Sequence, residues 1–207
     1  LNGYVTALDA NPTGDVTAVL SAQVANGVFE TKLTLIRVGD RVSTKEVLLP
    51  DTFVGQAAFL SDDRLALVCR DRLLILNAEG GTVAEAAANG AEPLLCAFGS
   101  GEVALLCEDP TNLSHTLLRV YDRNGRAAYE ISLPAVSGAS TMIFNGGDVY
   151  LLTSDAVWRM GNGGRRVETL SVGRNVLTLL DAGKETPLLC APAHAYHLKS
   201  EDFSPVN

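Results

Sequence analysis

The sequence predicts an all-β fold made of about five successive four-stranded sheets, and three observations lead to that class. Short apolar segments alternate with turn residues along the chain, and no segment keeps the 3.6-residue period of a helix. This pattern repeats about every 40 residues. Each repeat holds four segments, here called A to D, which is typical of one blade of a β-propeller. Because each twisted sheet has two apolar faces, blades must pack face to face to bury them.

Segments A and B open each repeat and are joined by a short turn. Segment A ends in large apolar residues followed by Asp, Ser, Gly or Asn, which tolerate turn dihedrals. Segment B is an almost continuous apolar run, as expected of an inner strand covered on both faces. The five B segments are DVTAVLS, RLALVC, EVALLC, DVYLLT and TPLLC.

Segments C and D form a second hairpin whose turn contains glycine in four repeats. Glycine supplies the positive φ that tight hairpin turns need. These glycines are Gly39, Gly80, Gly125 and Gly163, and Asp202 takes the matching place in the fifth repeat. Segment D also carries one glutamate in register in the first four repeats, namely Glu46, Glu85, Glu130 and Glu168. Val83–Ala88 has helical propensity, but it matches segment D, so we predict a strand there.

We predict a single domain over residues 1–207, with blades at about 4–51, 52–90, 91–136, 137–175 and 176–207. The last blade has segments A to C, in Val176–Leu180, Pro187–Cys190 and Ala195–Lys199, but no convincing segment D. Leu1–Gly3 are too few residues to supply it. The ring is therefore expected to be open or partial, with the missing strand supplied by upstream sequence or by another copy. Bare strand edges of this kind favour association. A β-sandwich or an up-and-down barrel is the rival all-β fold.

The register of the four segments and their turn residues resembles the WD40-like and quinoprotein-like propeller repeats as a broad class. Diagnostic motifs are absent, since the sequence has no Gly-His or Trp-Asp dipeptide and no YVTN stretch, and its single tryptophan is Trp158. Within this class the chain is similar to an uncharacterised bacterial group whose propeller follows a membrane anchor. That resemblance implies an extracytoplasmic domain of unknown function.

Composition excludes several other classes of protein. Apolar residues make up 47 % of the chain, enough to fill a core, which excludes intrinsic disorder. The net charge of −8 disfavours nucleic-acid binding, because the chain shows no basic stripe to offset it. No apolar run reaches the roughly 20 residues of a membrane span, and no signal peptide is visible. The first residue is Leu rather than Met, so we expect that upstream sequence has been removed.

The four cysteines lack the spacing of a metal site. Cys69, Cys107 and Cys190 end apolar runs, which favours free, buried thiols. A disulfide between Cys96 and Cys107 across a hairpin is the alternative, and the sequence leaves it open.

Several polar groups invite a chemical interpretation, and each has a simpler one. Asp9–Asp15 has the look of a calcium loop, but the twelfth position is Leu20 rather than glutamate, so we predict a hairpin turn. Ser61-Asp62-Asp63 and Glu108-Asp109 are interpreted as solvated acidic turns. The four glutamates of segment D are interpreted as charges that keep an edge strand from pairing, rather than as a carboxylate ring.

The histidines and arginines give equally weak signals. His194 and His197 lie three positions apart on a predicted strand, which places them on opposite faces, and His115 lies in a long loop. Arg165 and Arg166, with Arg159 and Arg174 nearby, are the only concentration of basic residues, and a hairpin tip explains them.

We therefore predict a non-catalytic scaffold that binds a protein or glycan partner, with no cofactor, no metal and no membrane contact of its own. An enzyme with its site at the propeller axis is one alternative, and a structural segment of a larger propeller is another. The enzyme would need ionisable groups from several A-segment ends. Those ends are Asp9, Ser61, Gly99, Asn145 and Asp181, and only two of them are acidic.

Overall fold

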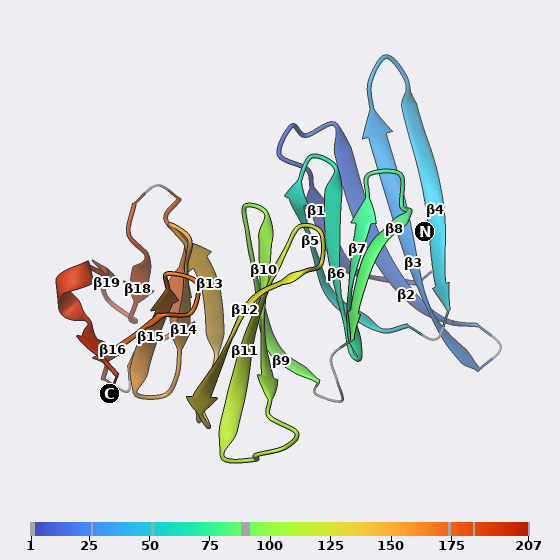
Figure 1. Cartoon of the computed structure of the whole chain (residues 1–207). Helices are drawn as coiled ribbons and strands as arrows, with labels where there is room; N and C mark the ends of the chain where they lie inside the picture. The colour runs from blue at the N-terminus through green and yellow to red at the C-terminus, as the bar shows by residue number, and fades with distance from the viewer. Residues whose placement is uncertain are drawn as a thin grey trace. The chain divides into compact units, whose positions relative to one another are not determined.

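The computed structural model describes residues 3–25, 27–50, 52–87, 92–173, 175–183 and 185–206, and in these it is all-β apart from one 3-10 turn at Ser200–Asp202 (Figure 1). Contacts within the chain cluster into two compact units. Unit one holds Leu1–Pro93, Ser100–Val103 and Tyr121–Arg126, and unit two holds Leu94–Gly99, Ala104–Val120 and Ala127–Asn207. The prediction of a single domain therefore stays a prediction.

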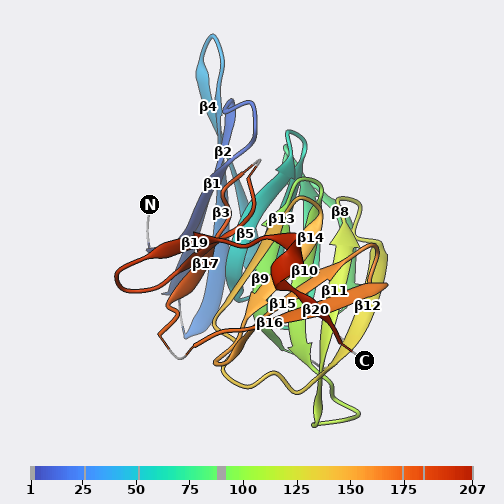
Figure 2. The ribbon, with the colours of Figure 1, turned by 90° about the vertical axis from the view of Figure 1, so that its left-hand side faces the viewer.

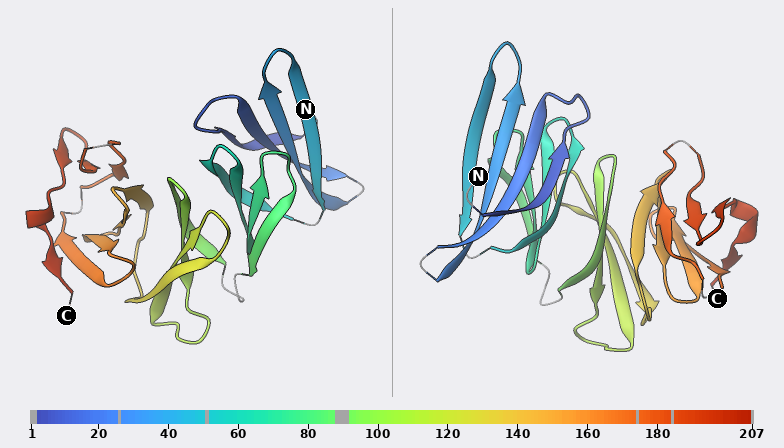
Figure 3. Two further views of the ribbon diagram at one scale, coloured as in Figure 1. Left: turned by 45° about the horizontal axis from the view of Figure 1, so that its top comes forward. Right: turned by 180° about the vertical axis from the view of Figure 1, so that it is seen from behind.

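The first two sheets lie in unit one, and each is a four-stranded antiparallel sheet in chain order. The first sheet consists of β1 (Tyr4–Ala10), β2 (Val16–Ala25), β3 (Val28–Val38) and β4 (Val42–Pro50). The second consists of β5 (Val54–Ser61), β6 (Arg64–Cys69), β7 (Arg72–Asn77) and β8 (Thr82–Ala87). The β3–β4 hairpin extends beyond the β1–β2 turn (Figure 3).

The third sheet follows the same order, and the boundary between the units passes through it. Its strands are β9 (Pro93–Gly99), β10 (Glu102–Glu108), β11 (His115–Asp122) and β12 (Ala127–Pro134). The fourth sheet contains β13 (Thr141–Asn145), β14 (Asp148–Leu152), β15 (Ala156–Gly161), β16 (Arg166–Ser171) and a late strand, β20 (Ser204–Pro205). The fifth has three strands, β17 (Thr178–Leu180), β18 (Leu188–Cys190) and β19 (Ala195–His197).

The core explains why the B segments are continuously apolar. In β6 every residue from Leu65 to Cys69 is buried, so both faces of this strand are covered. One face joins a cluster with Leu20, Leu33 and Leu35 of the first sheet. In unit two, β14 behaves in the same way. Its Leu151 packs in the cluster shared by the third and fourth sheets, and its Leu152 packs in the cluster shared by the fourth and fifth.

The predicted fold class is confirmed, because the chain forms successive four-stranded sheets and the last one lacks its outer strand. The ambiguous stretch that begins at Val83 is the strand β8, while Ala88 lies outside the described residues. Leu1 and Asn2 also lie outside them, and Gly3 forms a bend.

The structure adds one feature that the sequence did not predict. After β19 the chain makes the 3-10 turn and then runs beside β16, so that β20 becomes a fifth strand of the fourth sheet (Figure 2). The register places Pro205 opposite Glu168 and Ser204 opposite Thr169. Among the described residues, the outer edge of β19 therefore carries no partner strand, and the C-terminal segment reinforces a different sheet.

Candidate functional site

The candidate site is an open pocket of about 510 Å³ within unit one. Hairpin turns of the first three sheets supply its lining, and the A–B turns contribute most of it. The lining residues are Pro12, Leu60, Ser61, Asp62, Ser100, Gly101, Glu102, Asp122, Arg123 and Asn124. Turn residues can converge here because they stand at strand ends, where side chains are free of the sheet ladder.

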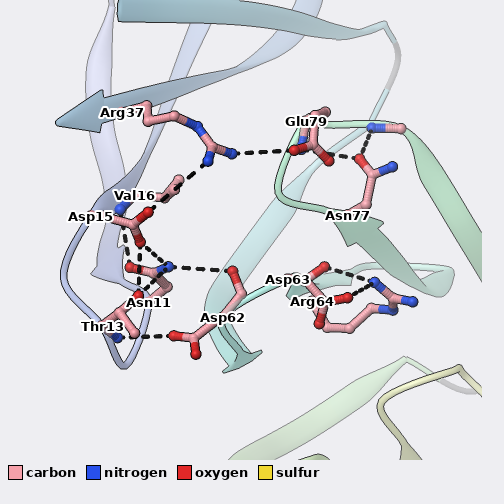
Figure 4. A network of polar contacts seen from close by, with 11 residues as sticks. Asn11, Thr13, Asp15, Val16, Arg37, Asp62, Asp63, Arg64, Asn77 and Glu79 are labelled. Atoms are coloured by element: carbon pink, nitrogen blue, oxygen red, sulfur yellow. Dashed lines mark hydrogen bonds and ion pairs between the residues drawn. The ribbon is translucent and has the colours of Figure 1, made fainter. Parts of the chain in front are cut away.

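A network of hydrogen bonds holds the first side of the pocket (Figure 4). The Thr13 backbone N–H donates to Asp62 Oδ1 over 2.9 Å. Asn11 Nδ2 donates to Asp15 Oδ1 at 2.7 Å and to the Asp62 carbonyl at 3.3 Å, while its Oδ1 accepts the Val16 N–H. These bonds join the A–B turns of the first and second sheets, so this wall of the pocket is fixed by the fold.

Electrostatics at the pocket are dominated by acidic groups. Asp62, Glu102 and Asp122 face one arginine, Arg123, among the lining residues. Asp122 Oδ1 accepts the N–H groups of Asn124 and Arg126 at 2.8 and 2.9 Å. The Arg126 N–H is the main reason that the pKa of Asp122 is held below its usual value, and this keeps the carboxylate ionised.

The residues at the segment A ends do not gather into one constellation. Asp9 Oδ2 accepts the Phe59 N–H at 2.7 Å, which joins the first two sheets. Asn145 Nδ2 donates to Asp181 Oδ1 at 2.8 Å, which joins the fourth and fifth. Ser61 lines the pocket, whereas Gly99 lies against the Phe144 ring. Within the described residues these groups bridge neighbouring sheets.

The Asp9–Asp15 segment is the A–B turn of the first sheet, as the hairpin interpretation predicted. Its oxygens are occupied by its own donors, since Thr13 Oγ1 donates to Asp15 Oδ1 at 2.7 Å. Hydrogen bonds from Asn11 and then Thr13 lower the pKa of Asp15. In the part of the chain that the structure describes, no cluster of three or more His, Cys, Asp or Glu could hold a metal ion.

The recurring glutamates have a partner that the sequence analysis missed. In each of the first four sheets the glutamate pairs with a cation on strand C. These pairs are Lys32–Glu46 at 2.9 Å, Arg72–Glu85 at 3.5 Å, Arg119–Glu130 at 2.5 Å and Arg159–Glu168 at 3.7 Å. Cross-strand pairs of opposite charge stabilise a sheet. The basic residues recur at intervals of 40, 47 and 40 positions, a signal that was readable in the sequence.

The fourth sheet builds this pair into a buried charge cluster. Asp148 accepts from Arg159 Nε at 2.7 Å and also from Arg166, and its side chain is 11 % exposed. The Arg159 guanidinium lies 5.8 Å from the centre of the Phe203 ring and donates to Ser200 Oγ at 2.9 Å. The two arginines predicted to mark a hairpin tip are thus largely used inside the sheet, while Arg174 lies outside the described residues.

The histidines and cysteines make local contacts. His115 Nδ1 lies 2.7 Å from Asn112 Nδ2 within the loop, and His197 Nε2 lies 3.6 Å from Glu185 Oε2. All four cysteines are free thiols, including Cys96 and Cys107. Burial raises the pKa of Cys69 and of Cys96 to about 12 and that of Cys107 to about 11, so these three are poor nucleophiles.

The sequence matches the model of one protein family, described as a family of unknown function, DUF5711, over residues 1–192. No curated protein matches it. Solved structures resemble it in fold. Hsv2 of Kluyvelomyces marxianus is 10 % identical with a TM-score of 0.62, and the chain's 99 % coverage meets 61 % of that protein. The Pan2 WD40 domain of Neurospora crassa is 14 % identical with a TM-score of 0.62, covering 93 % of this chain and 60 % of that one.

A third resemblance is to the β-propeller domain of the Trilobed protease from Pyrococcus furiosus, which has an open velcro topology. It is 9 % identical with a TM-score of 0.67, over 98 % of this chain and 70 % of that one. These likenesses establish the propeller fold, and this chain spans only about 54 to 61 % of the first three solved chains it matches. Among the described residues no helix is both long and apolar enough to cross a membrane.

Proposed function

The chain belongs to the DUF5711 family of unknown function, and on that premise we propose that it is a non-catalytic propeller scaffold that binds a protein partner through a basic segment. The single observation that carries the proposal is the pocket lined by turns of the first three sheets. The solved propellers that resemble the chain include both a WD40 domain and a domain of a protease, so the fold alone favours neither class.

The pocket favours recognition over chemistry because its carboxylates already have structural partners. Asp62 accepts a backbone N–H from the neighbouring turn, and Asp122 accepts two within its own turn. A general acid or base must exchange its proton with a substrate, whereas these carboxylates are held ionised and in place. Fixed negative charge suits a lysine or arginine side chain of a partner.

A basic protein segment fits this pocket better than a glycan does. Three of the ten lining residues are acidic and none is aromatic, so the pocket offers charge without a flat apolar platform. The chain's net charge of −8 would also speed the approach of a basic partner.

An array of basic, acidic and neutral 12-residue peptides probed with the labelled chain tests this function. We expect the bound peptides to be rich in lysine and arginine, with binding reduced by Glu102→Gln. Glu201→Gln is the matched control, because it removes the same charge at an exposed position of the C-terminal turn. Equal loss in both variants would reject the pocket. Mass spectrometry of the peptides after incubation would reveal cleavage, and cleavage would reject a non-catalytic role.

We further propose a bacterial extracytoplasmic setting, which rests on the resemblance to membrane-anchored bacterial propellers. Protease treatment of intact spheroplasts of a bacterial host tests this location. The native protein should be digested without lysis, and protection until lysis would place it inside the cell.

A further inference from the structure

One contact between neighbouring sheets recurs three times. In each case a glycine in the C–D turn of one sheet rests on strands of the preceding sheet. A Cβ built on Gly80 would lie 2.6 Å from Val47 Cγ2, one on Gly125 would lie 2.6 Å from Ala84 Cβ, and one on Gly164 would lie 3.0 Å from Tyr129 Cδ2. Real Cβ atoms do not approach so closely, so glycine is needed for the turn to seat. Each junction therefore has two halves, a glycine turn and the strands that receive it.

The first sheet carries the turn half of this junction without a receiving half. Its C–D turn contains Gly39, and a Cβ built there would have nothing within 4 Å. The flanking residues Val38 and Val42 are 52 % and 68 % exposed. This turn stands at the tip of the β3–β4 hairpin, which extends beyond the β1–β2 turn (Figure 3).

The face of the first sheet that continues from this turn is also uncovered at its edges. Leu8, Val19, Thr34 and Glu46 are paired in one row across the four strands, on the face opposite to the buried Leu20 and Leu33. Leu8 is 68 % exposed at the inner end, and Leu48, two residues after Glu46 on the same face, is 52 % exposed. Apolar groups at both ends of a sheet face suit packing against another sheet.

The fifth sheet carries the complementary half. One of its faces is buried against the fourth sheet through Leu179 and Leu189. The opposite face holds the row Leu180, Leu188 and His197, and Leu180 is 48 % exposed. This sheet has no fourth strand among the described residues, so its receiving side is open.

We propose that a second copy of this chain fills the uncovered face, with the first sheet of one copy seated on the free face of the fifth sheet of the other. One chain carries both unmatched halves of a junction that it otherwise repeats, so the contact is continuous with interfaces already formed inside each copy. Such a head-to-tail contact uses two different surfaces, and it extends beyond two copies unless the ring closes.

Analytical ultracentrifugation between about 1 µM and 1 mM tests the association. The wild-type mass should rise above 21.8 kDa with concentration. Val42→Glu blocks the turn side and Leu180→Glu blocks the receiving side. Both positions are exposed, so both variants should keep the wild-type far-ultraviolet circular dichroism. Each variant alone should remain at 21.8 kDa, because every contact requires both surfaces.

Mixing the two variants is the decisive step. The intact first sheet of the Leu180→Glu copy can still seat on the intact fifth sheet of the Val42→Glu copy. The mixture should therefore give a dimer of twice 21.8 kDa and nothing larger. Leu113→Glu is the control, because Leu113 is 84 % exposed in the β10–β11 loop, away from both surfaces, and this variant should associate like the wild type.

Two results would overturn the proposal. A wild-type mass fixed at 21.8 kDa over the whole range would mean that the two faces meet within one chain or receive blades of a longer polypeptide. A mixture that stays monomeric while the wild type associates would mean that association uses another surface.

Discussion

The first and fourth sheets carry the same cross-strand pair in different surroundings. In the first sheet Lys32 and Glu46 are 20 % and 58 % exposed, whereas in the fourth Arg159 and Glu168 are 12 % and 19 % exposed. Exposed pairs are screened by water and contribute little, but a buried charge is costly unless a partner compensates it. A motif that repeats in sequence therefore need not repeat in its contribution to stability.

The cause of the difference lies outside the repeat itself. Asp148 adds a second carboxylate to the fourth sheet, and the C-terminal segment covers the cluster with Ser200 and Phe203. The first sheet has neither feature. The fourth sheet should thus be more sensitive to the loss of one charge than the first, and the following substitutions test that difference.

The largest effect is expected from Asp148→Ala. This change leaves Arg159 and Arg166 near one another with only Glu168 to balance them, and removal of one partner from a buried pair costs about 3–5 kcal/mol. We expect unfolding in urea, followed by circular dichroism, to show a loss of that size. Asp155→Ala, at an exposed position of the same sheet, should cost less than about 1 kcal/mol. Similar losses in both variants would contradict a special role for the cluster.

The turn glycines test whether a contact that recurs in structure also carries energy. Gly80→Ala combines a positive φ of 78° with a clash against Val47, and we expect a loss of about 2–3 kcal/mol. Gly14→Ala has a similar φ of 76° but nothing within 4 Å, so it should cost about 1 kcal/mol, the contribution of the backbone alone. Equal losses, measured by the same urea titration, would mean that the packing contact is negligible.

The glutamates themselves allow the most direct comparison. Glu168→Gln should lower the free energy of unfolding by about 1 kcal/mol, and Glu46→Gln by less than about 0.5 kcal/mol. In 1 M salt the effect at Glu46 should vanish, because exposed charges are screened, while the effect at Glu168 should persist. A loss at Glu46 as large as that at Glu168 would remove the distinction between the two sheets.

The buried thiols of the second and third sheets give the smallest effect, and it depends on pH. In the folded chain burial raises the pKa of Cys69 to about 12 and that of Cys107 to about 11, above the ordinary value of 9.0. Above pH 9 the unfolded chain loses these protons while the folded chain keeps them, so stability falls from there toward the folded pKa values. A Cys69→Ala/Cys107→Ala variant should lose less stability between pH 8 and 10 than the wild type. An unchanged slope of the urea midpoint against pH would contradict the shift.

The sheets were predictable from sequence because strand burial leaves a direct trace in composition. The continuous run Leu65–Cys69 could only belong to a strand covered on both sides, and the turn glycines fixed the hairpins around it. Gly163 marked the right turn, although its neighbour Gly164 is the residue that contacts the preceding sheet.

The pocket and the charge cluster were not predictable, because both depend on residues that meet only in space. Asp62 and Asn124 lie in different sheets and line one pocket. Asp148 reads in the sequence as an ordinary turn carboxylate, and only its register beside Tyr150 and Arg159 places it among the arginines. The strand β20 has two residues and no apolar pattern, so its pairing with β16 left no signal.

The pairing of β20 also determines how the protein is best handled in the laboratory. The Val206 N–H still donates to the Val167 carbonyl at 3.0 Å, so the chain is anchored to the fourth sheet almost to its last residue. A reporter or purification tag fused at the C-terminus would emerge from that anchored edge. Trimming the segment from Ser200 onward would instead strip Phe203 from its apolar cluster and take a hydroxyl from Arg159. Extension at this end is therefore safer than truncation.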